Sequence, residues 1–213
     1  MLNKLLTCFS LTLALTVATP AFAGTVAWEW SGAVTEFHNG LDYTYGSVFV
    51  PTGNLIVSDL GYFNPTAGMT DSHWVGLYDS EGNLLAQTTV NSNSTLNGHF
   101  LFNSIVPVTL TSGNQYVIDA VGGTVDDYAY NANGFFTDAN VAWAAHNWVS
   151  NGGQNFTGTS DTPDDLINNG FFGGNFIYGG EGITGGGSAP EPASFVLFGT
   201  GLLVAGLIRR RRS

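Results

Sequence analysis

The chain has 213 residues, a formal net charge of −11 at pH 7 and an isoelectric point near 4.3. Its five basic residues, Lys4 and Arg209 to Arg212, lie near the two ends, while the span from Gly24 to Ala189 has no Lys or Arg and contains all of the 16 acidic residues except Glu191. So acidic a body repels phosphate backbones, which excludes nucleic acid as a partner.

The first element in chain order is a signal peptide over residues 1–23. Lys4 precedes an apolar run, and Ala21 and Ala23 form the small-x-small pattern that signal peptidase cleaves, so that the mature chain begins at Gly24. The only cysteine lies inside this segment. We therefore expect an exported mature protein without disulfides or thiol chemistry.

The body consists of short apolar runs, rich in aromatic and β-branched residues, that Gly, Asn, Asp and Pro separate. This pattern is typical of strands. Two hairpins are expected, over residues 73–90 and 106–120, because Gly and Asn in their central turns tolerate positive φ. Residues 141–149 suit either a helix or a strand. The expected strands are residues 25–30, 47–50, 55–63, 73–78, 84–90, 99–105, 108–110, 115–121 and 170–178.

Regular strand spacing predicts an all-β fold, an antiparallel β-sandwich of jelly-roll type, over residues 24–182. A Gly-rich linker follows over residues 183–189. Such a linker is flexible, so it separates the folded domain from the end of the chain.

Patterns of known catalytic sites are missing from the body. Its histidines form neither an HxH pair nor an HExxH helix, and no G-x-S-x-G turn is present. Asp71, Ser72 and His73 have the residue types of a catalytic triad, but neighbours on a strand point to opposite faces. We expect a non-enzymatic protein without a required cofactor. Carboxylates that converge from distant strands leave an enzyme of unknown type as a third possibility.

Acidic loops offer one candidate metal site, for calcium. Carboxylate oxygens in loops of an exported protein suit this cation, although the same residue types are also common in turns. No loop follows the EF-hand pattern. The candidate ligands are Asp126, Asp127, Asp161, Asp164 and Asp165.

Tryptophans offer a candidate carbohydrate site. An exposed indole can stack on a sugar ring, whereas a buried one packs in the core. A carbohydrate-binding module, with or without calcium, is therefore the alternative function. The candidate residues are Trp28, Trp30, Trp74, Trp143 and Trp148.

The last 24 residues, 190–213, combine three elements. Pro190, Glu191 and Pro192 come first, and residues 193–208 follow without a charge. As a helix this stretch is about 24 Å long, close to the roughly 30 Å of a bilayer core, so a single short transmembrane helix is expected. A cluster of four basic residues follows this helix and would stay on the cytoplasmic side of the membrane. It consists of Arg209, Arg210, Arg211 and Arg212.

These three elements, in this order, resemble the PEP-CTERM sorting signal, the substrate of exosortase, a membrane-integral cysteine transpeptidase. The resemblance implies an inner-membrane-anchored precursor, cleavage near the Pro-Glu-Pro motif, and a final place at the cell surface or in the extracellular matrix, where exopolysaccharide is the expected partner. Parts of the body also resemble a β-sandwich domain that precedes this signal and brings no catalytic residues with it. These parts are residues 60–63, 72–90, 106–120 and 173–179.

Overall fold

The computed structural model of the chain describes residues 24–38, 40–150, 152–159 and 170–179. In this part of the chain all regular structure is strand and there is no helix, which confirms the prediction of an all-β fold. The expected signal-peptide helix and the helix over residues 193–208 lie outside it. No helix in the same ranges is long and apolar enough to span a membrane.

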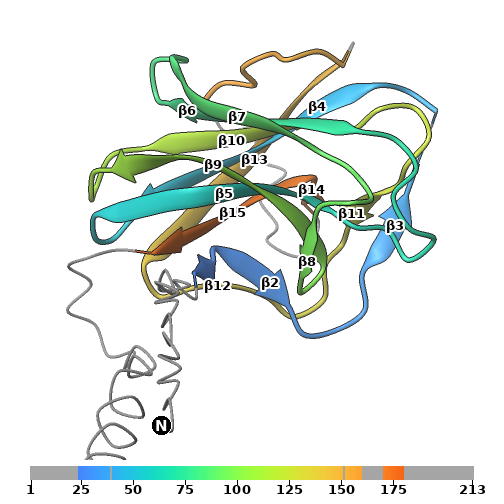
Figure 1. Cartoon of the computed structure of the whole chain (residues 1–213), viewed down its shortest axis with the longest axis horizontal. Coiled ribbons are helices and arrows are strands. Elements are labelled where there is room, and N and C mark those ends of the chain that lie inside the picture. The colour runs from blue at the N-terminus through green and yellow to red at the C-terminus, as the bar shows by residue number, and fades with distance from the viewer. Residues whose placement is uncertain (1–23, 39, 151, 160–169, 180–213) are drawn as a thin grey trace, which may run out of the picture. The chain divides into compact units, whose positions relative to one another are not determined.

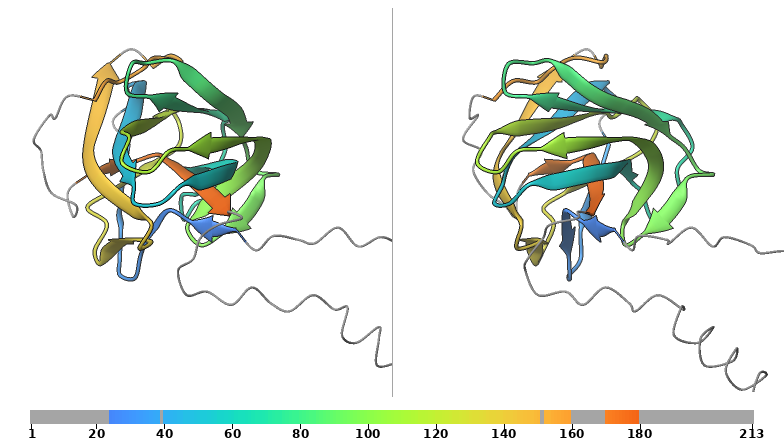
Figure 2. Two further views of the ribbon diagram at one scale, coloured as in Figure 1. Left: turned by 90° about the vertical axis from the view of Figure 1, so that its left-hand side faces the viewer. Right: turned by 60° about the vertical axis from the view of Figure 1, so that its left-hand side comes forward.

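Two five-stranded antiparallel sheets form a sandwich (Figures 1 and 2). The first, named the β5 sheet, has the order β1 (Thr25–Val26), β15 (Gly174–Gly179), β5 (Leu55–Phe63), β9 (Phe100–Leu110) and β8 (Thr95–Asn97). The second, named the β4 sheet, has the order β13 (Val141–Ser150), β4 (Tyr43–Pro51), β10 (Tyr116–Val121), β6 (His73–Asp79) and β7 (Leu84–Val90).

Two smaller antiparallel sheets complete the described fold. One has the order β14 (Phe171–Phe172), β11 (Tyr128–Tyr130) and β3 (Thr35–Phe37), and the other pairs β12 (Phe135–Thr137) with β2 (Trp28–Trp30). Each of these strands has only two or three residues. Such short strands depend on packing against the main sheets for their stability.

The core between the main sheets is filled largely by aromatic rings. Trp28 of β2 contacts Phe176 of β15 edge to face, with ring centroids 5.4 Å apart, and Phe176 lies 4.7 Å from Phe49 of β4. All three side chains are fully buried. Burial of a Phe side chain stabilises the fold by roughly 1.5–3 kcal/mol relative to exposure. These contacts join strands that are far apart in the sequence.

The β4 sheet is covered on both faces. Along β10, Ile118 and Ala120 point into the main core, whereas Val117 belongs to a second apolar cluster on the outer face. Alternate residues of a strand point to opposite faces, so burial of both faces explains the nearly continuous apolar sequence of this strand.

The predicted hairpin over residues 73–90 is confirmed. β6 and β7 pair antiparallel, and Asp79 Oδ1 accepts hydrogen bonds from the N–H groups of Glu81 and Asn83 in the turn. Gly82 has φ +85°, a conformation that side chains with a Cβ rarely adopt. Residues 141–149, which suited either structure, lie within strand β13.

The predicted hairpin over residues 106–120 is wrong. The chain turns at Gly113, with φ +80°, but β9 belongs to the β5 sheet while β10 belongs to the β4 sheet. β9 is also one strand rather than the two expected. Pro107 lacks an N–H group, but it lies where the register with β5 shifts between Val57 and Asp59, so the strand continues through it. A bulge accommodates a proline within a strand.

The close packing around Gly61 predicts that a larger side chain at this position destabilises the fold. A Cβ atom at this position would lie 2.4 Å from Cδ1 of Phe102, whose ring packs over the glycine. We expect Gly61→Ala to lower the free energy of unfolding by roughly 1–3 kcal/mol through overpacking, measured by denaturant unfolding. Gly53→Ala is the matched control, since no atom lies within 4 Å of its Cβ position. Equal stability of the two variants would contradict the prediction.

Candidate functional site

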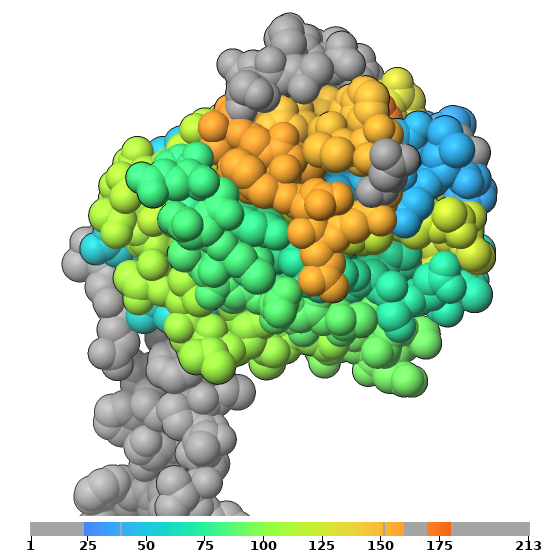
Figure 3. Space-filling view, turned by 90° about the horizontal axis from the view of Figure 1, so that it is seen from above, coloured from blue at the N-terminus to red at the C-terminus, as the bar shows by residue number. Residues whose placement is uncertain are grey.

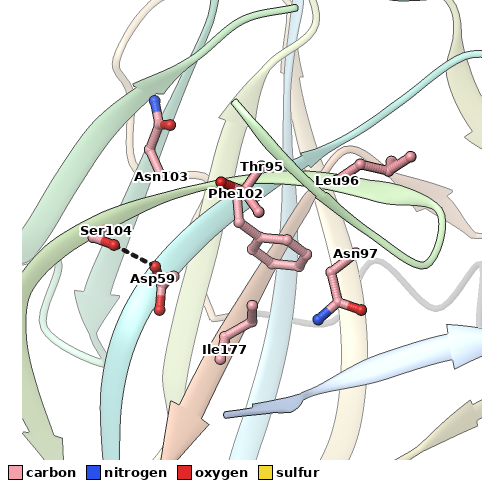
Figure 4. Close-up of a pocket in the computed structure, with 8 residues that line it drawn as sticks. All are labelled: Asp59, Thr95, Leu96, Asn97, Phe102, Asn103, Ser104 and Ile177. Carbon is pink, nitrogen blue, oxygen red and sulfur yellow. Dashed lines mark hydrogen bonds between the residues drawn. The ribbon is translucent and has the colours of Figure 1, made fainter. Parts of the chain in front are cut away.

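A shallow groove of about 330 Å³ lies on the β5 sheet (Figure 4). It draws residues from β5, β8, β9 and β15, and its polar groups are hydroxyls, amides and one carboxylate. This set can donate and accept hydrogen bonds but brings no positive charge. The lining residues are Asp59, Thr95, Leu96, Asn97, Phe102, Asn103, Ser104 and Ile177.

Asp59 is held in place by two neutral donors. The hydroxyl of Ser104 donates to Oδ1 over 2.7 Å, and that of Ser58 donates to Oδ2 over 2.6 Å. Asp59 and Ser104 meet because they are register partners on β5 and β9. Phe102 also lines the groove, but this residue is 2% exposed, so its ring is not free to stack on a ligand. The groove therefore suits weak hydrogen bonding rather than stacking.

A second feature is an aromatic cluster where β4 and β13 meet the sheet of β3, β11 and β14. Its rings are linked by contacts such as that of Tyr45 with Tyr128, whose centroids are 4.5 Å apart. Burial raises the pKa of Tyr45, so its hydroxyl stays protonated. We call this set the aromatic cluster; it consists of Phe37, Tyr43, Tyr45, Tyr128, Tyr130, Trp148 and Phe171.

Two members bring the aromatic cluster to the surface. Trp148 is 45% exposed and Phe37 is 44% exposed. The indole of Trp148 packs against Tyr43 with centroids 5.6 Å apart and an angle of 82° between the rings. An edge-to-face contact of this kind orients the exposed ring.

The five candidate tryptophans do not form one platform. Trp28, Trp30 and Trp74 are buried, so their rings pack inside the protein and present no face to a ligand. Trp143 is partly buried against the main core. Of the five, Trp148 alone is exposed.

The first candidate calcium ligand, Asp126, is buried and already engaged. Its carboxylate accepts hydrogen bonds from the N–H groups of Thr70 and Asp71 and lies 2.9 Å from Nε2 of His73. Burial raises the pKa of Asp126, but the bonds from His73 and the two N–H groups outweigh it, and the pKa lies below its usual value. These bonds occupy the oxygens that a cation would need.

His73 is the central residue of this arrangement. Its Nδ1 lies 3.0 Å from the carbonyl oxygen of Val121, so each ring nitrogen faces an oxygen acceptor. The ring stacks on Tyr62 with centroids 3.8 Å apart. The hydrogen-bonded pair of His73 and Asp126 therefore joins the β5–β6 connection and the start of β6 to the loop that follows β10.

The remaining candidate ligands do not complete a site that the structure shows. Asp127 is partly buried, and Asp161, Asp164 and Asp165 lie outside the described residues. Within residues 24–159, apart from 39 and 151, and residues 170–179, no group of three or more His, Cys, Asp or Glu side chains could hold a metal ion.

Sequence reasoning missed the polar residues of the groove. Asp59 and Ser104 are 45 positions apart in the chain, and only the register of β5 with β9 brings them together. No spacing motif marks such a pair. Trp148 is among the five candidate tryptophans, but nothing in the sequence distinguishes it from the four that are buried or partly buried.

The described residues define an antiparallel β-sandwich protein with a polar surface groove and an aromatic cluster that reaches the surface at Phe37 and Trp148. Residues 30–173 match the model of the family described as "Domain of unknown function (DUF4082)", and the chain belongs to this family. No curated protein matches the chain.

The C-terminal part matches a second model, that of the PEP-CTERM protein-sorting motif, over residues 188–212. This match confirms the resemblance of the tail to a sorting signal. The motif marks an exported protein that is anchored in the membrane before exosortase processes it, and it implies processing by signal peptidase as well. It assigns no specific function to the body.

Asp126 generates a prediction about pH. A carboxyl whose pKa is lower in the folded than in the unfolded chain stabilises the fold above the unfolded-state pKa, and this contribution is lost as the pH falls through the folded-state pKa. We expect Asp126→Asn to lower the free energy of unfolding by on the order of 2 kcal/mol at pH 7. We also expect its stability to fall less steeply than that of the wild type below pH 4.

Denaturant unfolding between pH 7 and pH 3 measures both effects. Glu81→Gln is the control, because this residue is exposed in the β6–β7 turn and its neutralisation should leave the pH profile unchanged. Identical profiles for Asp126→Asn and the wild type would show that the pair with His73 does not stabilise the fold.

Proposed function

We propose that the protein is a non-enzymatic component of the cell surface or extracellular matrix, and that it associates there with exopolysaccharide through the aromatic cluster at Trp148. The observation that carries this proposal is the exposure of Trp148, which stands at 45% while its indole is oriented by Tyr43. Phe37, 44% exposed, extends the apolar surface of the same cluster. Exposed aromatic rings of this kind pack on the apolar faces of sugars.

The charge of the body narrows the class of polymer. No Lys or Arg lies between Gly24 and Ala189, so no such side chain can pair with a uronate or sulfate group. The 15 acidic residues of that span repel a polyanion as well. The proposed partner is therefore a neutral polysaccharide or one that carries amino groups.

The state of the carboxylates supports a non-enzymatic role. Glycoside hydrolysis needs two carboxyl groups that flank an open substrate site. In the described chain, Asp59, Asp126 and Asp138 each accept a hydrogen bond from a segment distant in the sequence, that of Asp138 coming from the hydroxyl of Tyr178. Asp119, whose pKa burial raises, lies under residues 152–159 and has no access to a substrate.

The first test of the proposal is affinity electrophoresis of the wild type and of two variants in gels that contain a neutral glucan, chitosan or alginate. We expect the neutral glucan or chitosan to retard the wild type and alginate to leave it unaffected. Trp148→Ala should weaken the affinity that the retardation measures by about 2- to 12-fold, since one aromatic contact is worth roughly 0.5–1.5 kcal/mol.

Asp59→Asn is the matched control, because it changes the groove on the β5 sheet and leaves the aromatic cluster intact. Loss of binding in Asp59→Asn but not in Trp148→Ala would move the site to the groove. Preferential binding of alginate would contradict the proposed class of polymer.

Export and processing have a separate test, the intact mass of the protein from its native host and from a host without exosortase. The native host should yield a species that starts at Gly24 and ends near Pro190 to Pro192, with or without an attached group. The second host should yield a chain that extends to Ser213. A native species that keeps Ser213 would identify the tail as a permanent anchor.

A further inference from the structure

Residues 152–159, named the strap here, lie across the outer face of the β4 sheet. Figure 3 shows this part of the chain in orange beside the green β6–β7 hairpin. Beneath it is the second apolar cluster, to which Phe156 of the strap contributes. The other members of that cluster are Val48, Trp74, Tyr78, Val117, Val121 and Ala145.

The strap is attached to the sheet by one ring contact and by hydrogen bonds of Gly152, Gly153, Thr157 and Gly158. The ring of Phe156 packs on Tyr78, with centroids 5.3 Å apart. Near one end the hydroxyl of Thr44 donates to the carbonyl oxygen of Gly153 over 2.6 Å, and near the other Nδ2 of Asn147 donates to that of Gly158 over 2.5 Å. A segment with one apolar anchor and no strand pairing opens at a lower free energy than the sheet beneath it.

Asp119, at the centre of β10, points outward under the strap and is fully buried. Its register partners on the neighbouring strands are Gly46 and Gly76, which leave room for the carboxyl. A Cβ at Gly46 would lie 2.3 Å from Oδ1 of Asp119. The strap closes this space with Thr157, whose hydroxyl donates to Oδ1 over 2.6 Å and whose N–H donates to Oδ2 over 3.1 Å.

Among the described residues, no Lys, Arg or His side chain contacts Asp119 to offset its charge. Neither β4 nor β13 presents an ionisable side chain at this face, and the strap, from Gly152 to Thr159, contains none. β6 contributes Tyr78, whose pKa is raised by burial and by the charge of Asp119. Burial raises the pKa of Asp119 to about 7, although the two bonds from Thr157 act in the opposite direction.

We propose that Asp119 and the strap form a pH-dependent latch, in which the strap closes over the protonated carboxyl and opens more readily once the proton is lost. The protonated form also fits the geometry, since its O–H can donate to the hydroxyl oxygen of Thr157 while the other oxygen still accepts the N–H bond. Opening admits water to the carboxylate and uncovers the apolar side chains on the outer face of the sheet.

The direction of the pH dependence follows from linkage. With the strap open, Asp119 is hydrated and titrates near its ordinary value of 3.8, whereas with the strap closed it titrates near 7. Between these values the closed state holds a proton that the open state releases, so the opening equilibrium increases as the pH rises through this window and levels off above it.

The test is hydrogen–deuterium exchange of the full-length chain between pH 5 and pH 8, read at amides 153–159 after division by the intrinsic exchange rates. We expect the opening constant of the wild type to rise on the order of 50- to 100-fold over this range. In Asp119→Asn the rise should disappear, because the neutral amide does not titrate. Asp59→Asn, a change on the other sheet, should keep the wild-type dependence.

A second variant, Thr157→Val, tests the proposal independently in case Asp119→Asn does not fold. Thr157→Val removes the hydroxyl that stabilises the ionised carboxylate, so the rise should shift to higher pH. Carboxyl carbon NMR of the wild type measures the titration of Asp119 directly. A strap whose opening changes less than about threefold, the same rise in Asp119→Asn, or a titration midpoint near the ordinary value would each overturn the latch.

Discussion

The absence of Lys and Arg from residues 24–189 is the constraint on which the rest of the structure depends. Acidic groups must be stabilised by neutral donors or by histidine, and the number of such donors sets the direction of each pKa. For Asp126 and Asp138, hydrogen bonds outweigh burial and the pKa is lowered. In the part of the chain that the structure describes, Asp119 accepts hydrogen bonds from Thr157 alone, and burial raises its pKa. Hydrogen bonding thus keeps the carboxylates of Asp126 and Asp138 ionised at neutral pH, whereas the carboxyl of Asp119 titrates near neutral pH.

Glycine shapes the sheets as much as the aromatic residues fill them. At Gly61 the ring of Phe102 lies where a Cβ would be, and at Gly76 the indole of Trp74 does the same, with a separation of 2.3 Å. Glycine in a strand weakens it locally because it offers no side chain to pack. At these two positions the absence of a Cβ makes room for the neighbouring ring, so that Phe102 and Trp74 stay buried against the backbone.

The strands with clear alternation and a marked turn could be predicted from the sequence, and β6 with β7 is the best case. The short strands β3, β11 and β12 could not, because three residues carry no measurable periodicity. The error over residues 106–120 has another cause: a turn signal shows that the chain reverses, but not whether the next strand joins the same sheet. The site depended still more on tertiary structure, since exposure of Trp148 follows from the pairing of β13 with β4.

An opened strap would ordinarily be the place where proteases cut, because exposed loops with small and polar residues are their preferred substrates. Enzymes with trypsin-like specificity, however, hold a basic side chain in an acidic pocket next to the bond they cleave. The strap has no Lys or Arg, and neither does any other part of residues 24–189. The domain therefore offers this class of protease no cleavable bond, whether the strap is open or closed.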